Sequence, residues 1–238
     1  MPASIRPGDP DQVRDLFDQI APAYDRLNDT LSLGLHRLWK RQAVAWLDPA
    51  PGQRLLDLCC GTGDLALVLA QKVRPGGLVL GLDAAAAPLG QARRRAASQP
   101  WLPLEFRQGD AQATGLAAGW ADGAVMAYGL RNLQDPAAGL QELRRLLKPG
   151  ARAAVLDFNR PVDGAGFTAG FQRFYLRQLV VPLARRAGLE PQYAYLEESL
   201  RRFPTGAQQE QLAQSAGFAQ ARHRRLAAGQ MGLLQLVA

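Results

Sequence analysis

Short apolar runs alternate with longer amphipathic stretches through the first two thirds of the chain. Most of the runs are rich in leucine, valine and alanine, which is typical of strands buried on both faces of a parallel sheet. The stretches between them carry apolar residues at helical spacing. The pattern predicts strands near 54–59, 78–82, 104–108, 123–128 and 152–157 and helices over 64–73, 86–98 and 136–147. We therefore expect an α/β fold with a mostly parallel sheet and helices on both faces.

Two outer regions flank this alternation. Residues 11–47 carry apolar positions spaced for short amphipathic helices and predict an N-terminal helical appendage. Residues 206–216 predict a closing helix, and strands near 219–226 and 231–237 bring the sheet to seven strands. Residues 160–204 interrupt the alternation of predicted strands and helices and are rich in aromatic and basic side chains. We expect a single domain over 1–238, divided into an N-terminal helical cap (1–50), a ligand-binding core (51–158), an inserted helical lid (159–205) and a closing helix with strands (206–238).

The composition is that of an ordinary globular protein. The 238 residues are 47% hydrophobic and 21% charged, which suits one large domain. The formal charge of +7 favours acidic partners only weakly, because the basic residues are nearly all arginine and lie among abundant alanine, as a compositional bias of the gene would produce. Outside 171–186, arginines are not interleaved with stacking aromatic residues, so we expect no nucleic-acid partner.

The sequence carries no signal for export, membrane insertion or metal binding. No stretch approaches the roughly 20 apolar residues of a membrane-spanning helix, and the N-terminal MPASIRPGDPDQ lacks the apolar block of a signal peptide. A disulfide between the neighbours Cys59 and Cys60 would be strained, so both are expected as small apolar residues of a buried strand. His223 has no partner at metal-binding spacing. We therefore expect a cytoplasmic protein without a metal.

A glycine-rich turn stands between the first predicted strand and helix, in LLDLCCGTGDLALVLA at 55–70. Strand, tight turn and helix in this order are the layout of a nucleotide-binding crossover. Gly61, Gly63 and Ala66 satisfy the dinucleotide-binding fingerprint, and Asp83 follows about 20 residues later, where a ribose-binding acid is expected. The turn alone is compatible with a dinucleotide-dependent dehydrogenase.

Acidic side chains around the turn favour a different ligand. Asp57 and Asp64 would repel a pyrophosphate but attract the ammonium and sulfonium groups of S-adenosylmethionine, although Asp64 also suits an ordinary helix start. Asp83 and Asp110 follow the next two strands, at the edge of the sheet where ligands bind. We expect Asp83 to accept both ribose hydroxyls and Asp110 to bind the adenine amino group, but each alone could be a turn residue. The predicted cofactor-binding residues are Asp57, Gly61, Thr62, Gly63, Asp83, Asp110 and Ala111.

Further motifs connect this core to one protein family. DLCCGTGDLAL, GDA at 109–111 and YGLRNLQDP at 128–136, followed by LRRLLKPG, resemble the class I methyltransferases that C-methylate quinone precursors in ubiquinone and menaquinone biosynthesis. LFDQIAPAYDRLNDTLSLGLHRLWKR at 16–41 is similar to the N-terminal signature of this family, and YLEESLRRFP with AGF at 216–218 is similar to its C-terminal one. LHRLWKR and the closing AAGQMGLLQLVA look most like the cyanobacterial and plastid branch, which methylates 2-phytyl-1,4-naphthoquinone on the way to phylloquinone. The chain departs from the family at AAAAPLG after Asp83, where a more polar helix start is usual.

This resemblance implies a Rossmann-like class I methyltransferase fold, S-adenosylmethionine as the cofactor, and C-methylation of a prenylated or phytylated naphthoquinol. A long-tailed naphthoquinol is then the partner. Another quinone or small molecule stays open as the substrate, including demethylmenaquinone or a ubiquinone precursor, because all such enzymes share the cofactor residues.

The implied reaction needs a nucleophilic ring carbon, which a quinol provides once the neighbouring hydroxyl loses its proton. Arg131, after the fourth predicted strand, is the first candidate for holding the phenolate; the alternatives are a surface arginine or a partner of Asp135. Tyr128 and Asn132 are candidate substrate ligands in the same segment, and Asn132 also suits a helix start.

The N-terminal signature supplies two more catalytic candidates. The resemblance implies that this segment, with Tyr24, folds over the cofactor and the quinone. His36 is a candidate base because imidazole titrates near the working pH, and a water molecule or a carboxylate is the alternative base. Its flanking Leu35 and Leu38 also suit a histidine that only packs or forms hydrogen bonds.

Residues 167–189 place aromatic and apolar side chains at near-helical spacing, with arginines between them. A helix packed on the sheet would show this pattern. We expect an apolar lid for the quinone tail, in which Phe171 and Tyr175 contact the substrate, resting on an anionic membrane surface. The arginines expected at that surface are Arg173, Arg177, Arg185 and Arg186.

Overall fold

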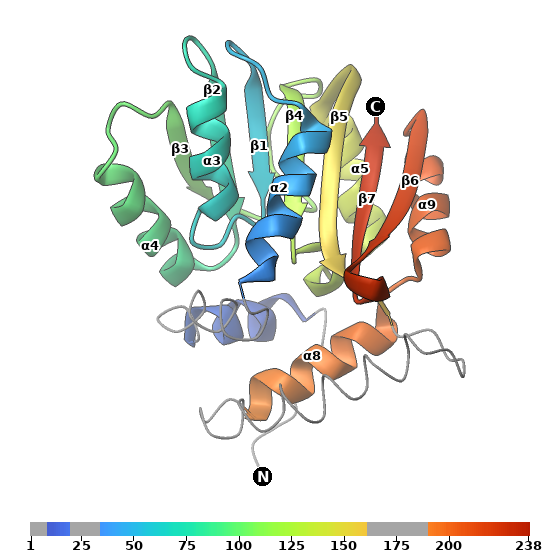
Figure 1. The fold of residues 1–238 in the computed structure, drawn as a ribbon. Helices are drawn as coiled ribbons and strands as arrows, with labels where there is room; N and C mark the ends of the chain where they lie inside the picture. Colours follow the sequence, from blue (N-terminus) through green and yellow to red (C-terminus); the bar gives the residue numbers. More distant parts are fainter. Residues whose placement is uncertain (1–8, 20–33, 161–189) are drawn as a thin grey trace.

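The computed structural model describes residues 9–19, 34–160 and 190–238, which form a seven-stranded sheet with helices on both faces (Figure 1). The strands are β1 (Arg54–Leu58), β2 (Leu78–Asp83), β3 (Leu104–Gln108), β4 (Ala121–Ala127), β5 (Leu147–Phe158), β6 (Gln220–Leu226) and β7 (Met231–Val237). The helices beside the sheet are α2 (Leu35–Leu47), α3 (Asp64–Lys72), α4 (Ala86–Ala97), α5 (Pro136–Leu146) and α9 (Gly206–Ser215). A helix over residues 10–19 and α8 (Glu190–Arg202) lie beneath the carboxyl ends of the parallel strands.

The strand order is β3-β2-β1-β4-β5-β7-β6. Neighbours from β3 to β5 pair in parallel, whereas β7 pairs antiparallel with both β5 and β6. The chain builds outward from β1 to β3 and then returns to the other side of β1 with β4. The order therefore reverses between β1 and β4, and in open α/β sheets ligands bind beside the carboxyl ends of the strands at such a point.

Both faces of the sheet are buried, as the apolar runs predict. In β1, Leu56 and Leu58 pack into a core that includes Leu140 and Leu143 of α5. Leu55 packs on the opposite face, in a core formed with α2 and α3. Alternate residues of one strand thus pack into two separate cores, and this is why the sequence of the strand is continuously apolar.

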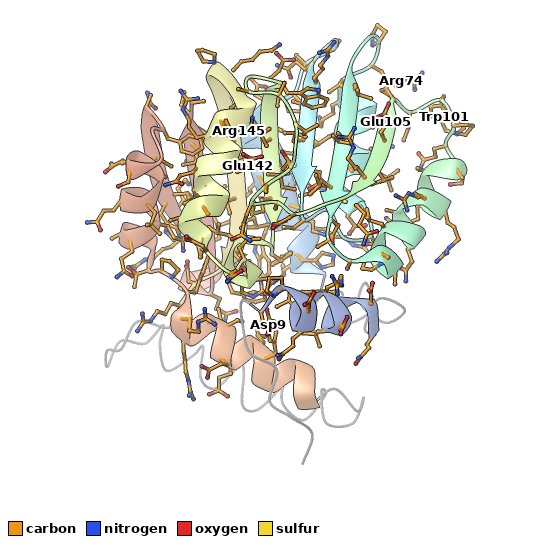
Figure 2. All side chains as sticks on the ribbon, turned by 180° about the vertical axis from the view of Figure 1, so that it is seen from behind. Asp9, Arg74, Trp101, Glu105, Glu142 and Arg145 are labelled. Atoms are coloured by element: carbon orange, nitrogen blue, oxygen red, sulfur yellow. The ribbon has the colours of Figure 1, made fainter. Side chains whose placement is uncertain are left out.

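A buried carboxylate joins α5 to the loop that follows β3. Glu142 accepts hydrogen bonds from the backbone N–H and the hydroxyl of Thr114 at 2.9 and 2.6 Å. It also pairs with Arg145 at 2.6 Å, and the two side chains lie next to each other on α5 (Figure 2). The hydrogen bond from Arg145 lowers the pKa of Glu142 to about 2. The loop after β3, which carries Asp110 and Ala111, is therefore held against α5.

The predicted elements of the sheet and its covering helices are confirmed, with two differences at their ends. The strand expected near 152–157 begins at Leu147, because Leu147 already pairs with Ala121 beyond an irregularity in the register. Cys59 and Cys60 follow β1 rather than lying within it, and Cys59 is half-buried in the turn, so the placement of both on a strand is wrong. The division into cap, core, lid and closing region stays a prediction, because residues 161–189 lie outside the described part.

None of the helices within the described ranges is both long and apolar enough to cross a membrane.

Candidate active site

A cavity of about 540 Å³ opens at the carboxyl ends of the strands, beside the reversal of strand order. This volume is within the range of small-molecule sites, about 300–1,000 Å³. Its wall combines the turn after β1, the ends of β2, β3 and β4, and one face of the helix over 10–19. The residues that matter below are Cys59, Gly61, Asp83, Asp110, Ala111, Tyr128 and Asn132 from the sheet side and Pro10, Val13, Arg14 and Phe17 from the helix.

Asp83 links the end of β2 to the glycine turn. Its Oδ2 accepts a hydrogen bond from the N–H of Gly61 at 2.7 Å, and its Oδ1 accepts one from the N–H of Ala85 at 2.9 Å. Burial raises the pKa of Asp83. Each carboxylate oxygen has a second lone pair, so Asp83 can hold the turn and still accept two hydroxyl groups from a ribose in the cavity.

The two glycines of the turn have different roles. Gly61 has a φ of 54° and lines the cavity, and a Cβ added there meets no protein atom within 4 Å. A side chain at Gly61 would therefore occupy ligand space. Gly63 has a φ of 82°, and a Cβ added there would lie 2.8 Å from the ring of Phe106. Gly63 is thus required for packing, and its predicted cofactor contact has no support in the cavity wall.

Thr62 also faces away from the cavity. It is 3% exposed, and Arg95 of α4 donates hydrogen bonds to its carbonyl oxygen at 2.9 Å and its hydroxyl at 3.3 Å. These bonds tie the turn to α4. The cofactor contact predicted for the Thr62 side chain stays a prediction.

Asp57 lies beneath the turn, 1% exposed and off the cavity wall. Its Oδ2 accepts a hydrogen bond from the N–H of Ala66 at 2.8 Å, while its Oδ1 has no hydrogen-bond partner within the described residues. Burial raises the pKa of Asp57 to about 7. A carboxylate in this position would attract a nearby cationic group, such as the ammonium group of S-adenosylmethionine, through its charge.

Asp64 does not have the role that its position suggests. It forms ion pairs with Lys40 at 3.0 Å and with Arg95 at 2.6 Å. Although burial raises the pKa of Asp64, these two cations outweigh it and lower the pKa to about 2. The expectation that Asp64 attracts the cofactor is therefore corrected: its charge is compensated by the protein, and it joins α2 and α4 to the start of α3.

Asp110 and Ala111 follow β3, and the structure places both on the wall of the same cavity as Asp83. Asp110 Oδ1 accepts a hydrogen bond from the N–H of Gln112 at 2.8 Å, which fixes the carboxylate in the turn. Acids at the ends of two neighbouring strands thus line one cavity, and their contacts with a ribose and an adenine stay predictions.

Arg131 belongs to a buried ion pair behind the cavity wall. Its guanidinium pairs with Asp157 of β5 at 2.5 Å, donates to the carbonyl of Tyr128 at 3.2 Å and lies 5.3 Å from the ring centre of Phe158. Its side chain is 8% exposed. Both alternatives considered for Arg131, a surface residue and a partner of Asp135, are therefore wrong. Asp135 instead caps α5 by accepting from the N–H of Ala137 at 2.8 Å.

Asn132 lines the cavity from η1 (Leu130–Asn132), a short 3₁₀ helix, and its amide is held in one orientation. The hydroxyl of Tyr195 in α8 donates to its Oδ1 at 2.8 Å, and its Nδ2 donates to the carbonyl of Tyr128 at 2.8 Å. Burial raises the pKa of Tyr195 to about 12, so this hydroxyl keeps its proton. One N–H of the Asn132 amide remains for a ligand.

Tyr195 was not among the candidate residues from the sequence. The signal was present in YLEESLRRFP, which resembles a family signature, but nothing in the linear pattern linked it to Asn132, 63 residues earlier.

The remaining candidates lie apart from the cavity or outside the described residues. His36 is 5% exposed in the first turn of α2 and is not part of the cavity wall, so its role as a base stays a prediction. Tyr24, Phe171 and Tyr175 lie outside the described residues. Among the residues that the structure describes, no group of three or more histidine, cysteine, aspartate or glutamate side chains could hold a metal ion.

The strand order, the antiparallel β7, the glycine turn and the acids at or just after the carboxyl ends of β1, β2 and β3 define a Rossmann-like class I methyltransferase. The profile of the ubiE/COQ5 methyltransferase family matches residues 7–235, and the chain belongs to this family. The prediction of a class I methyltransferase related to quinone-methylating enzymes is confirmed.

Curated relatives and a solved structure agree with this assignment. The 2-phytyl-1,4-naphthoquinone methyltransferase of Synechococcus elongatus is 49% identical over 94% of this chain and 96% of its own length. The chloroplastic 2-phytyl-1,4-beta-naphthoquinone methyltransferase of Arabidopsis thaliana is 42% identical over 93% of this chain and 85% of its own. Phosphoethanolamine N-methyltransferase 2 of Haemonchus contortus, solved in complex with S-adenosyl-L-methionine, matches 94% of this chain and 59% of its own with a TM-score of 0.69. Its identity of 16% makes that last likeness one of fold.

Proposed function

We propose that this protein transfers a methyl group from S-adenosylmethionine to a ring carbon of a long-tailed naphthoquinol, with reduced 2-phytyl-1,4-naphthoquinone as the substrate and phylloquinone as the end product after reoxidation. The observation that carries the proposal is the 49% identity, over 94% of the chain, to an enzyme named for this substrate. The cavity supports it, since acids for a nucleoside and a fixed amide for an oxygen ligand face the same space.

The residues present fit the cofactor. Asp83 would hold the ribose hydroxyls and Asp110 the adenine amino group, while the charge of Asp57, from beneath the turn, would attract the ammonium group. When bound, S-adenosylmethionine supplies an electrophilic methyl group on a sulfonium. Gly61 leaves room for the ligand, because any side chain there would project into the cavity.

On the substrate side, Asn132 would donate its remaining N–H to the quinol oxygen as that oxygen becomes a phenolate. A donor held in advance stabilises the developing charge without having to reorient during the reaction. In this geometry Arg131 acts as a positioning residue, because its guanidinium bonds to Asp157 and to the carbonyl of Tyr128, which also accepts from Asn132. His36, a water molecule or a carboxylate remain candidates for the base that takes the hydroxyl proton, and Tyr24 remains a catalytic candidate.

Mass-resolved methyl transfer tests the proposal. The protein is incubated with S-adenosylmethionine and 2-phytyl-1,4-naphthoquinone, with and without a reductant. We expect a mass gain of one methyl group only with the reductant, because the oxidised ring is a poor carbon nucleophile. Measurable cofactor binding without any product would contradict the substrate and leave the methyltransferase class in place. Tight binding of NAD without binding of S-adenosylmethionine would contradict the cofactor.

The same assay separates the alternative substrates. Demethylmenaquinone and a ubiquinone precursor are offered in competition with the phytylated naphthoquinone, each in reduced form. A higher kcat/KM for either of them would replace our choice of substrate.

We further propose a cytoplasmic protein that contacts anionic membranes, from which a long-tailed quinol would enter. Arg173, Arg177, Arg185 and Arg186 carry this proposal, and they lie outside the described residues. Co-sedimentation with vesicles should require anionic lipid and weaken with salt, and should fall when Arg185 and Arg186 are changed to Gln. Binding that is insensitive to both salt and lipid charge would contradict it.

A further inference from the structure

The start of α4 lacks a cap of its own. The N-cap residue is Ala85, within the run Ala84–Ala87, and alanine has no side-chain acceptor for the exposed N–H groups of a first helical turn. Serine, threonine, aspartate or asparagine usually stands at this position.

The missing acceptor comes from a distant part of the chain. Oδ1 of Asp18 accepts a hydrogen bond from the N–H of Ala87 at 2.7 Å, across 69 residues of sequence. Asp18 stands near the end of the helix over 10–19, which lies beneath the carboxyl ends of the strands close to α4 (Figure 1). A charged carboxylate at a helix N-terminus also interacts favourably with the helix dipole.

The helix that carries Asp18 forms one side of the cavity. Pro10, Val13, Arg14 and Phe17 line the cavity, and their spacing places them on a single helical face. Asp9 begins this helix by accepting from the N–H groups of Asp11 and Gln12 at 3.2 and 3.1 Å; Figure 2 shows Asp9 beneath the sheet. A formed helix thus covers the cavity, and Asp18 attaches its far end to α4.

The point of attachment adjoins the ribose side of the site. α4 begins three residues after Asp83, and Asp83 itself accepts from the N–H of Ala85. Ala84, Ala85 and Pro88 also line the cavity. The bond from Ala87 to Asp18 therefore joins the cover of the cavity to the segment that would hold the ribose.

We propose that Asp18 is a positioning residue for the cofactor: by capping α4 it holds the helix over 10–19 across the cavity and slows release of S-adenosylmethionine. The proposal rests on the cofactor assignment but not on the choice of quinone. It makes one carboxylate serve two purposes, the stability of α4 and the closure of the site.

The test uses the full-length protein and measures the dissociation constant and the dissociation rate of S-adenosylmethionine. Asp18→Ala should raise the dissociation constant about fivefold, mainly through a faster dissociation rate, because a cap hydrogen bond of ordinary strength is lost. Asp18→Asn keeps an acceptor oxygen and should have a smaller effect, which covers the case in which Asp18→Ala folds poorly. Asp15→Ala is the matched control, since Asp15 is an exposed carboxylate of the same helix whose one ion pair within the described residues is with Arg14, at 3.9 Å.

A second substitution separates closure from helix stability. Ala85→Ser, added to Asp18→Ala, gives α4 a cap from its own chain and should restore thermal stability while release of the cofactor stays fast. Restoration of slow release by Ala85→Ser would overturn the proposal, because Asp18 would then matter only for α4. Unchanged release in Asp18→Ala would also overturn it. Failure of the unaltered protein to bind S-adenosylmethionine would overturn both this proposal and the cofactor assignment. Failure to methylate the quinone would contradict only the proposed substrate.

Discussion

The side of the cavity that we propose for the cofactor and the side that we propose for the substrate are held together in different ways. On the cofactor side, carboxylates accept hydrogen bonds from backbone N–H groups: Asp83 from Ala85 and Gly61, two and 22 residues away, and Asp57 from Ala66, nine residues away. On the substrate side, side chains bond to side chains across longer separations, 26 residues for Arg131 with Asp157 and 63 for Asn132 with Tyr195. The first arrangement needs only β1, the glycine turn, the neighbouring β2 and the starts of α3 and α4, whereas the second exists only when η1, β5 and α8 have all packed.

This difference predicts that the two sides respond differently to substitution. A change on the cofactor side should alter binding of S-adenosylmethionine without unfolding the sheet. A change on the substrate side should disturb either global stability or methyl transfer, depending on how deeply the altered group is buried.

The largest effect is expected at the buried ion pair. Asp157→Ala removes the carboxylate that accepts from Arg131 in a site where both side chains are nearly inaccessible. We expect the free energy of unfolding to fall by about 3–5 kcal/mol, measured by urea denaturation. Asp135→Ala is the control, because it removes an exposed helix cap and should cost only about 1 kcal/mol. Equal losses in the two variants would mean that the ion pair contributes little.

The second largest effect is expected at Gly61, and it separates the role of Gly61 in ligand binding from the role of Gly63 in packing. Gly61→Ala puts a side chain into a left-handed backbone position, at about 1–2 kcal/mol, and places its Cβ in ligand space. S-adenosylmethionine binding, measured by calorimetry, should weaken strongly while the fold persists. Gly63→Ala should instead lower stability through its clash with Phe106. Unweakened binding by the folded Gly61→Ala protein would remove Gly61 from the ligand site.

A smaller effect is expected from the hydroxyl that orients Asn132. Tyr195→Phe removes one hydrogen bond, worth about 1 kcal/mol, and should lower kcat for methyl transfer roughly fivefold. The dissociation constant of S-adenosylmethionine should not change, because Asp83 and Asp110 are untouched. Arg201→Ala, an exposed substitution on the same helix, serves as the control. A loss of cofactor affinity in Tyr195→Phe would show that the two sides are not separate.

The smallest effect concerns pH. The pKa of Asp57 is about 7 in the folded protein, against an ordinary value of 3.8. The contribution of the protonated carboxyl to folding stability is therefore fully present below pH 3.8 and is lost as the pH rises through about 7. The ionised form is the one that would bind an ammonium group. Cofactor affinity should therefore rise severalfold as the pH increases through 7, until the ammonium loses its own proton at about 8. Asp57→Asn should abolish this rise in a calorimetric titration; an unchanged pH profile would exclude Asp57 as the group responsible.

Much of the fold was predictable because each strand or helix is encoded by its own local pattern. The apolar runs and helical stretches lie within segments of five to thirteen residues in the final structure. Asp83 and Asp110 were predictable for the same reason, since a residue that ends a parallel strand must reach the common edge of the sheet. The segment around Arg131 was also identified, but the partner of Arg131 was not.

The sequence by itself determined the class of fold and the edge of the sheet that carries the cavity, because periodicity and turn chemistry act over short stretches. The resemblance of its motifs to known enzymes indicated the family. Only the tertiary structure decided how the charges are paired. Asp64 binds two cations, Arg131 binds Asp157, and Asp18 caps α4, each across more than 20 residues. Charge interactions depend on distance and burial in three dimensions, and a linear pattern contains neither.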